Sequence, residues 1–283
     1  MSARERIARE LARIEAAALR REVREALPPG ALDFSSNDYL GLSRDPHVLE
    51  ALRASACAGS GGSRLLAGAH PEHAALEREL AAWLGRERVL LFSSGYLAVL
   101  GAVATLGTLC DIVYSDRLVH ASAIDAIRLC ARPKHIYPHA TLPPLAAEAA
   151  PVALVVSESI FGMDGDALDL AALLGALRPG DLLVLDEAHA LGIAGPTGAG
   201  AARAFADPRI VVVGTLSKAF GDQGGFVAAS RDVVELLVSR ARSFIFDTSL
   251  APPLAAAARA ALAIVRGAEG ERLRERLRAN VQL

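Results

Sequence analysis

The chain has 283 residues, of which 52% are hydrophobic and 22% charged, and its formal net charge is −2. A chain of this length can bury a large core, as one big domain or as a domain with an appendage. The near-neutral charge gives no electrostatic reason to expect nucleic acid or an anionic membrane as a partner. No apolar run reaches the ~18 residues that a membrane-spanning helix needs, so we expect no membrane span.

The N-terminal stretch, residues 1–27, alternates Arg and Glu with Ala and Leu and is typical of a surface helix. It lacks the uninterrupted apolar centre of a secretory signal, and its many Glu residues argue against a transit peptide. The three cysteines, Cys57, Cys110 and Cys130, are odd in number and have no CxxC spacing. Free thiols in a reducing compartment are the simplest interpretation, so we expect a cytoplasmic protein.

A Pro-Pro-Gly break at residues 28–30 separates this helix from the elements that follow. Residues 32–42 are predicted to form an ordered loop or a short strand, residues 46–58 a helix, and residues 58–68 a glycine-rich loop. Residues 71–84 are predicted to form a strongly amphipathic helix, because Pro occupies its first turn and apolar residues recur at helical spacing.

Strand-like and helical runs alternate along the rest of the chain. The strand-like runs are residues 89–92, 112–114, 135–137, 152–156, 182–185, 210–213 and 226–229, and the helical runs are 96–106, 121–130, 168–177 and 231–240. This alternation predicts an α/β fold, with a mostly parallel seven-stranded sheet between helices. Ligands of such sheets bind beyond the carboxyl ends of the strands.

Two of these strands deliver a lysine and an aspartate to that edge. Residues 210–213 lead through a Gly-Thr-Leu-Ser turn to Lys218, and residues 182–185 end in Asp186. Such a lysine can form a Schiff base with pyridoxal 5′-phosphate (PLP), while the carboxylate keeps the pyridine nitrogen protonated. Most lysines are solvated loop residues, so it is the neighbouring motifs that favour the catalytic interpretation of Lys218.

Two further segments at this edge also allow an ordinary interpretation. Residues 93–95, Ser-Ser-Gly, precede a helix and either bind an anion through backbone amides or only cap the helix. His120 lies between a strand and a helix and is by itself typical of a capping or surface residue. The glycine-rich loop 58–68 fits neither the GxGxxG nor the P-loop template, so we expect no nucleotide site there.

The histidines give no case for a metal site. His70 with His73, and His135 with His139, have spacings that metal sites use, but neither pair has a third ligand in the sequence. The HExxH motif is absent as well. The DEAH string that contains His189 is found in helicases, but no Walker A motif accompanies it.

Seven motifs together resemble the α-oxoamine synthases, which are PLP-dependent enzymes of the aspartate aminotransferase fold type. They are SSNDYLGLS (35–43), GSGGSRLLAG (59–68), DRLVHAS (116–122), MDGD (163–166), DEAHALG (186–192), GTLSKAFG (214–221) and SFIFDTS (243–249). The motifs occur in family order across nearly the whole chain. Three of them are most similar to the branch that makes 8-amino-7-oxononanoate in biotin synthesis: GSGGSR, the lysine motif followed by QGGFVA, and ARSFIFDTS.

The resemblance implies roles for three catalytic residues. Lys218 would bond the cofactor and later move the substrate α-proton, Asp186 would pair with the pyridine nitrogen, and His120 would stack on the pyridine face. Asn37 would lie near the substrate carboxylate.

The resemblance also implies a larger set of cofactor contacts. His189 would hydrogen-bond the phenolic oxygen of PLP. Ser94 belongs to the phosphate-binding segment, in which Gly95, Tyr96 and Thr215 would hold the phosphate. Thr248 and Ser249 would reach the phosphate bound in a partner subunit, which implies a homodimer with shared sites.

The implied reaction is the decarboxylative condensation of L-alanine with a pimeloyl thioester, carried by CoA or by an acyl carrier protein. Three sibling activities stay open, namely aminoketobutyrate–CoA ligase (glycine C-acetyltransferase), aminolevulinate synthase and serine palmitoyltransferase. A noncatalytic PLP-binding protein is a further alternative, from another functional class. A general aminotransferase is disfavoured because the motifs agree with those of the synthases.

Two features depart from the family pattern. Gly162 stands before MDGD, where the family has Ser, which removes one potential hydroxyl contact to the cofactor. After SFIFDTS the sequence offers two helical stretches, 253–265 and 269–281, whereas the family continues into a small domain of about 100 residues with a carboxylate-gripping arginine. We therefore expect three parts: residues 1–44 as N-terminal helix and substrate-site segment, residues 45–250 as the PLP-binding large domain, and residues 251–283 as the start of an incomplete small domain.

Overall fold

The computed structural model describes residues 1–23, 28, 30–145 and 152–283, and its contacts divide the chain into two units, Met1–Ser36 and Asn37–Leu283. The first unit contains α1 (Ala3–Ala16), whose first turn is closed by a capping box between Ser2 and Glu5. The prediction of a helix over residues 1–27 is too long, because residues 17–23 are not helical, while residues 24–27 lie outside the described residues. No side chain of α1 is buried, so only local propensity supports the helix and limits its length.

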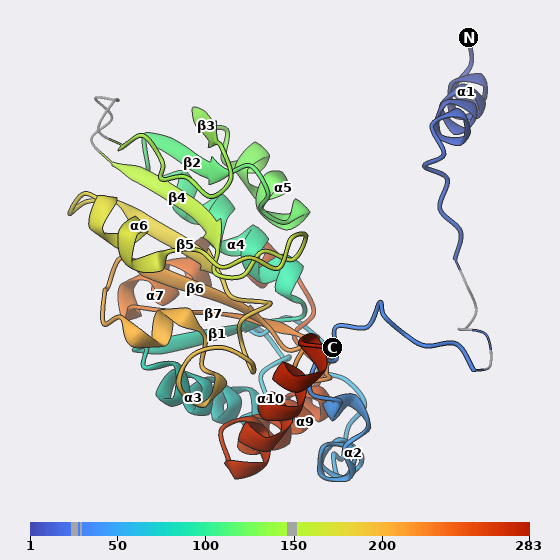
Figure 1. The fold of residues 1–283 in the computed structure, drawn as a ribbon, viewed down its shortest axis with the longest axis vertical. Helices are drawn as coiled ribbons and strands as arrows, with labels where there is room; N and C mark the ends of the chain where they lie inside the picture. The colour runs from blue at the N-terminus through green and yellow to red at the C-terminus, as the bar shows by residue number, and fades with distance from the viewer. Residues whose placement is uncertain (24–27, 29, 146–151) are drawn as a thin grey trace. The chain divides into compact units, whose positions relative to one another are not determined.

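The second unit is built on a seven-stranded sheet with the strand order β1-β7-β6-β5-β4-β2-β3 (Figure 1). The strands are β1 (Arg88–Phe92), β2 (Ile112–Asp116), β3 (Lys134–Tyr137), β4 (Ala153–Glu158), β5 (Leu182–Asp186), β6 (Ile210–Thr215) and β7 (Gly225–Ala229). β7 pairs antiparallel with both β1 and β6, and the other pairs are parallel. The seven predicted strands and the mostly parallel sheet are thus confirmed.

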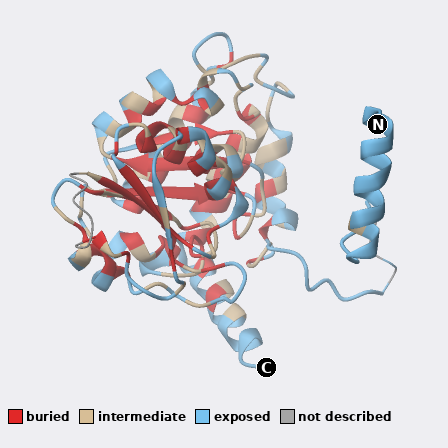
Figure 2. Ribbon diagram, turned by 90° about the horizontal axis from the view of Figure 1, so that it is seen from above, coloured by how far each residue is buried: buried red, intermediate tan, exposed pale blue. Residues whose placement is uncertain are grey.

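Helices cover both faces of the sheet and were largely predicted by the sequence. They are α2 (Pro46–Arg53), α3 (Pro71–Leu84), α4 (Gly95–Gly107), α5 (Ala121–Cys130), α6 (Leu170–Ala176), α7 (Arg231–Arg240), α8 (Arg242–Ile245), α9 (Pro252–Val265) and α10 (Ala268–Val281). One core cluster joins the sheet to α4, α5, α7 and α8, and the other joins it to α2, α3, α6 and α9. Figure 2 shows the buried residues concentrated in the strands and on the inward sides of these helices.

Successive side chains along a strand point to opposite faces of the sheet and so belong to different core clusters. Leu183 and Leu185 of β5 belong to one cluster, while Val184 belongs to the other, as the two-residue period of a strand requires. All three side chains are at most 1% exposed. A sheet covered on both faces explains why these strands are continuous hydrophobic runs in the sequence.

Smaller features of the second unit also bear on the predictions. The helix predicted over residues 46–58 ends at Arg53. Residues 32–42, predicted as an ordered loop or a short strand, form no strand; residues 39–40 make a turn, and Leu42 begins a short 3₁₀ helix, η1 (Leu42–Arg44). Cys57, Cys110 and Cys130 are free thiols, as expected. No described helix is both long and apolar enough to cross a bilayer. The domain boundaries predicted at residues 44 and 250 stay a prediction.

The topology brings three neighbouring strands to the same edge. β4, β5 and β6 are adjacent and parallel, and they end in Glu158, Asp186 and Thr215. Glu158 and Asp186 are direct cross-strand partners in the register. The fold therefore gathers polar and charged side chains where strands of this sheet type bind ligands.

The central strand should dominate stability. We expect Leu185→Ala to lower the free energy of unfolding by about 2–5 kcal/mol, because it removes a fully buried side chain and leaves a cavity. Leu129→Ala, at a helical position that is 65% exposed, should change that free energy by less than about 0.5 kcal/mol. Urea denaturation of both variants tests the expectation, and equal effects would contradict the assigned core.

Candidate active site

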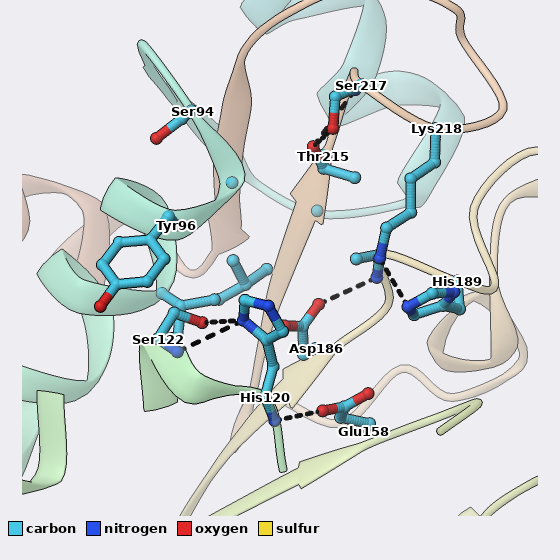
Figure 3. Close-up of a pocket in the computed structure, with 15 residues that line it drawn as sticks. Ser94, Tyr96, His120, Ser122, Glu158, Asp186, His189, Thr215, Ser217 and Lys218 are labelled. Carbon is cyan, nitrogen blue, oxygen red and sulfur yellow. Dashed lines mark hydrogen bonds between the residues drawn. The ribbon is translucent and has the colours of Figure 1, made fainter. Parts of the chain in front are cut away.

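A cavity of about 270 Å³ lies at the carboxyl edge of β4, β5 and β6, beside the start of α4 (Figure 3). Eight of the eleven predicted site residues line it: Ser94, Gly95, Tyr96, His120, Asp186, His189, Thr215 and Lys218. Glu158, Ser122 and Ser217 line it as well, although the sequence analysis did not select them. Asn37, Thr248 and Ser249 are not among the lining residues.

Lys218 lies just after β6, in the loop that reverses the chain toward β7. Its Nζ is 2.6 Å from His189 Nε2, and Figure 3 shows the side chain directed toward Asp186 and His189. Burial lowers the pKa of the Lys218 ammonium, and attraction to Asp186 and Glu158 limits that fall. The amine is therefore easier to deprotonate than an ordinary surface lysine, which is the property that a nucleophilic or basic lysine needs.

Asp186 ends β5 on the floor of the cavity. Its Oδ1 accepts a hydrogen bond from the Ala188 N–H at 2.9 Å, which holds the carboxyl group at the strand end. Burial raises the pKa of Asp186, whereas the Ala188 N–H and the charges of Lys218 and His120 lower it. A carboxylate held in such a poorly solvated place favours a proton on a nearby basic nitrogen.

His120 caps a helix, as its position in the sequence suggested, and also lines the cavity. It is the N-cap residue of α5, where Nδ1 accepts a hydrogen bond from the Ser122 N–H at 3.3 Å. Nδ1 also lies 2.8 Å from Ser122 Oγ. The same ring lines the cavity and meets the Tyr96 ring edge-on at a centroid distance of 6.3 Å. Capping therefore fixes a ring that faces the cavity.

Glu158 is a site residue that sequence reasoning missed. It ends β4 and is only 4% exposed, and its Oε1 accepts the His120 N–H at 2.6 Å. Burial and the nearby Asp186 raise the pKa of the Glu158 carboxyl to about 7. The available signal was its position, two residues past the predicted strand 152–156 and at the same edge as Asp186.

The start of α4 forms a cradle that small residues keep open. Ser94 is the N-cap of α4, and its Oγ accepts the Leu97 N–H at 3.2 Å. A Cβ on Gly95 would lie 2.9 Å from the Cβ of Thr215, and a Cβ on Gly225 would lie 2.5 Å from the Gly95 backbone. These glycines let three chain segments meet, so that the first-turn amides of α4 and the Thr215 hydroxyl lie close together. Such amides are suited to an anion.

His189 connects the cavity to the segment that contains Asn37. Its Nδ1 is 2.7 Å from the hydroxyl of Tyr39, and that hydroxyl donates to Asn37 Oδ1 at 3.0 Å. Burial and the charges of Lys218 and His120 lower the pKa of His189 to about 4. The ring is therefore neutral at physiological pH, and Asn37 is joined to the cavity although it does not line it.

Thr248 and Ser249 lie against the glycine-rich loop rather than in the cavity of their own chain. The Ser249 hydroxyl donates to Gly68 O at 2.6 Å, and Ser60 Oγ donates to Ser249 O at 2.9 Å. Thr248 lines a separate small cavity with Arg64 and Asp247. The loop at residues 58–68 thus packs on residues 245–249, and the predicted contact with a partner's phosphate stays a prediction.

The position of Gly162 is tied to His189. A Cβ at residue 162 would lie 2.4 Å from His189 Nε2, so the His189 ring occupies space that a side chain there would need. Gly162 therefore lacks the hydroxyl that a serine would bring, as the sequence indicated, and it also leaves space for the His189 ring. The Gly162 N–H also contributes a hydrogen bond to Glu158.

His139 does lie near two further candidate ligands, contrary to the expectation from the sequence. Its ring is close to Asp164 and Asp166 in a group that could hold a metal ion. However, Nδ1 lies 3.0 Å from Asp116 and Nε2 lies 2.9 Å from Asp166. Although burial lowers the pKa of His139, these hydrogen bonds outweigh it and raise the pKa. A ring that donates from both nitrogens has no lone pair for a metal.

The cavity fits the PLP that the sequence predicts. It combines a lysine amine, a carboxylate for a ring nitrogen, a histidine ring beside the space and an amide cradle for a phosphate. The Asp186 carboxyl accepts the Ala188 N–H and faces the cavity, and any side chain at residue 95 would fill the cradle at the start of α4. These groups converge from β5, β6, α4 and α5, which is the arrangement that a phosphorylated aromatic cofactor requires.

Replacement of Glu158 by Gln should stabilise the protein more at high pH than at low pH. A carboxyl whose pKa is raised on folding loses stability as the pH rises from its unfolded value through about 7, and Gln does not titrate. The gain in unfolding free energy should grow by on the order of 2 kcal/mol between about pH 5 and about pH 8. Glu275→Gln, at an exposed position on α10, is the control, and parallel pH profiles of the two variants would contradict the expectation.

Comparisons with known proteins agree with this site. Residues 29–283 match the family model for aminotransferase class I and II. The 8-amino-7-oxononanoate synthase of Burkholderia thailandensis is 44% identical over 263 residues, in a match that covers 88% of this chain and 67% of that protein. The relative from Burkholderia cenocepacia is also 44% identical, and 65% of it is covered. The chain thus spans about two thirds of the length of the curated relatives that it matches.

Solved structures share the fold as well. The serine palmitoyltransferase of Sphingomonas wittichii has a TM-score of 0.87 at 27% identity, over 99% of this chain and 76% of that chain. A structure of SPT with a PLP internal aldimine has a TM-score of 0.79 at 31% identity, over 87% of this chain and 64% of that chain. Fold, site and sequence agree, and the chain belongs to the aminotransferase class I and II family.

Proposed function

We propose that this chain binds PLP through Lys218 and condenses L-alanine with a pimeloyl thioester. The products would be 8-amino-7-oxononanoate, carbon dioxide and the free thiol. The observation that carries the proposal is the convergence of Lys218, Asp186, His120 and His189 on one cavity. The 44% identity to 8-amino-7-oxononanoate synthases supports this reaction over the sibling reactions.

Bound PLP supplies an electron sink that stabilises negative charge at the α-carbon of an amino acid attached to it. Asp186 would hold the proton on the pyridine nitrogen, because a poorly solvated carboxylate raises the pKa of a nearby base. Lys218 would remove and return the α-proton, since the burial that lowers its pKa leaves more neutral amine near pH 7.

Other residues would bind and orient. The N–H groups at the start of α4, with Thr215, would hold the phosphate, and His120 would cover one face of the ring. Glu158 would keep His120 in place through its hydrogen bond to the His120 backbone. His189 would hydrogen-bond the phenolic oxygen.

Substrate binding and assembly complete the proposal. Asn37 would contact the amino-acid carboxylate, because its Oδ1 is taken by Tyr39 and its amide N–H groups remain to donate. We propose a homodimer in which Thr248 and Ser249 reach the phosphate in the partner subunit. We also propose a cytoplasmic location, supported by three free thiols.

A second candidate is PLP binding without acyl transfer. The residues that line the cavity include no arginine, so within the described chain no guanidinium faces the space where a substrate carboxylate would bind. Both candidates bind PLP through Lys218, but only the first one turns over an amino acid and an acyl thioester.

The lysine assignment can be tested directly because the chain has two lysines, Lys134 and Lys218. After incubation with PLP and borohydride reduction, mass mapping should find the cofactor fixed to the peptide that contains Lys218. Lys218→Ala should abolish this label, while Lys134→Ala, at an exposed position on β3, should retain it. A label confined to Lys134 or to the N-terminal amine would refute the assignment.

Turnover should depend on the amino acid and on the acyl carrier. We expect L-alanine with pimeloyl-CoA or a pimeloyl carrier protein to give 8-amino-7-oxononanoate and carbon dioxide, as measured by product mass and gas release. Asp186→Ala should lower kcat by at least about 10²-fold, because the charge on the pyridine nitrogen is lost. Faster turnover with glycine or serine would favour a sibling synthase, and labelling without any turnover would favour the second candidate.

A further inference from the structure

The hydrogen bonds that join Asn37 to Lys218 pass through a half-buried tyrosine, Tyr39, that contacts no cofactor position. Tyr39 lies between Asn37 and His189, with its hydroxyl 3.0 Å from Asn37 Oδ1 and 2.7 Å from His189 Nδ1. On the other side of the ring, His189 Nε2 is 2.6 Å from Lys218 Nζ. One continuous chain of hydrogen bonds thus runs from an exposed amide to the amine of the lysine.

The segment around Tyr39 is held firmly enough to define this geometry. Asp38 accepts the Leu42 N–H at 2.9 Å and the Ser43 N–H at 3.2 Å, which closes the turn at residues 38–43. Leu40 and Leu42 are each 2% exposed. A Cβ on Gly221 would lie 2.1 Å from Ser43 N, so this turn packs directly on the loop that follows Lys218.

The numbers of donors and acceptors determine which atoms carry the protons in this series of hydrogen bonds. Asn37 Oδ1 can only accept, so the single proton of the Tyr39 hydroxyl is donated to it. The Tyr39 oxygen must then accept from His189, which places the imidazole proton on Nδ1. The other nitrogen, Nε2, is left as an acceptor for the Lys218 N–H. Burial raises the pKa of Tyr39 and lowers that of His189, so both groups are neutral as the count requires.

We propose that Tyr39 is a positioning residue that holds His189 by its Nδ1 and, in the cofactor-free chain, selects the Nδ1–H tautomer. The effect is to leave Nε2 without a proton, so that it accepts the Lys218 N–H. Asn37 contributes because its Oδ1 accepts the hydrogen bond of the Tyr39 hydroxyl, while its N–H groups stay available for other contacts.

The Tyr39 hydroxyl would also allow His189 to change tautomer when the cofactor binds, an inference that rests on the proposed function. A hydroxyl can accept or donate, so it serves both tautomers of His189. If an oxygen anion such as the phenolic oxygen binds at Nε2, the proton is needed there, and Tyr39 can turn to donate to Nδ1. A phenylalanine could hold the ring by packing but could serve neither tautomer.

The tautomer can be measured without cofactor, substrate or turnover. The protein is prepared with ¹⁵N-labelled histidine, and the signal of His189, one of seven histidines, is assigned with His189→Asn. Long-range ¹H–¹⁵N spectra should show a protonated Nδ1 and a bare Nε2 in the original chain. At a pH where the Lys218 amine is neutral and can accept, Tyr39→Phe should populate the Nε2–H form. The control Tyr137→Phe, in β3, should leave the His189 spectrum unchanged.

Variants of the exposed Asn37 give a second test that leaves the tyrosine in place. Asn37→Ala removes the acceptor for the Tyr39 proton and should shift His189 toward Nε2–H, whereas Asn37→Asp keeps an oxygen acceptor and should retain Nδ1–H. An Nε2–H signal in the original chain, or an Nδ1–H signal unaffected by both Tyr39→Phe and Asn37→Ala, would overturn the proposal. Because no reaction is measured, failure of the proposed synthase activity leaves this result interpretable.

Discussion

The site depends on one electrostatic constraint, the placement of a lysine amine near two carboxylates that are poorly solvated. Asp186 and Glu158 are cross-strand partners at the ends of β5 and β4, and attraction to both opposes the fall in the pKa of Lys218. Burial raises the pKa values of both carboxyl groups, and the charge of Asp186 raises that of Glu158 further. When Lys218 is protonated, its positive charge offsets theirs. Binding a group with a positive ring nitrogen would serve the same purpose for Asp186.

The fold satisfies this constraint through its parallel strands. Parallel neighbours place their carboxyl ends at one edge, so three consecutive strands in the sheet deliver Glu158, Asp186 and Thr215 together. Gly95 and Gly225 have no side chains, so their backbones approach closely and the start of α4 lies at the same edge of the sheet. His189 is neutral mainly because burial disfavours its charged form, and the nearby Lys218 and His120 charges disfavour a further cation as well.

The sequence was sufficient for much of this site because its chemistry is local. Lys218 and Asp186 each follow a strongly hydrophobic strand, so strand ends could be located and the shared edge inferred. Glu158 was missed because its importance comes from cross-strand pairing with Asp186 and from contact with the His120 backbone, neither of which is visible along the chain. Tyr39 lies within a recognised motif, but its contact is with a residue 150 positions away. The length of α1 was overestimated because its helical composition is not matched by any buried face.

The central claim is that Lys218, held over Asp186, bonds the cofactor and presents it to an amino acid. The most direct test is the absorbance spectrum of the purified chain with PLP, before and after addition of L-alanine. The account predicts a visible band from cofactor bonded to the lysine amine, which L-alanine shifts and which Lys218→Ala lacks. A spectrum identical to that of free PLP, or a band that survives in Lys218→Ala, would contradict it.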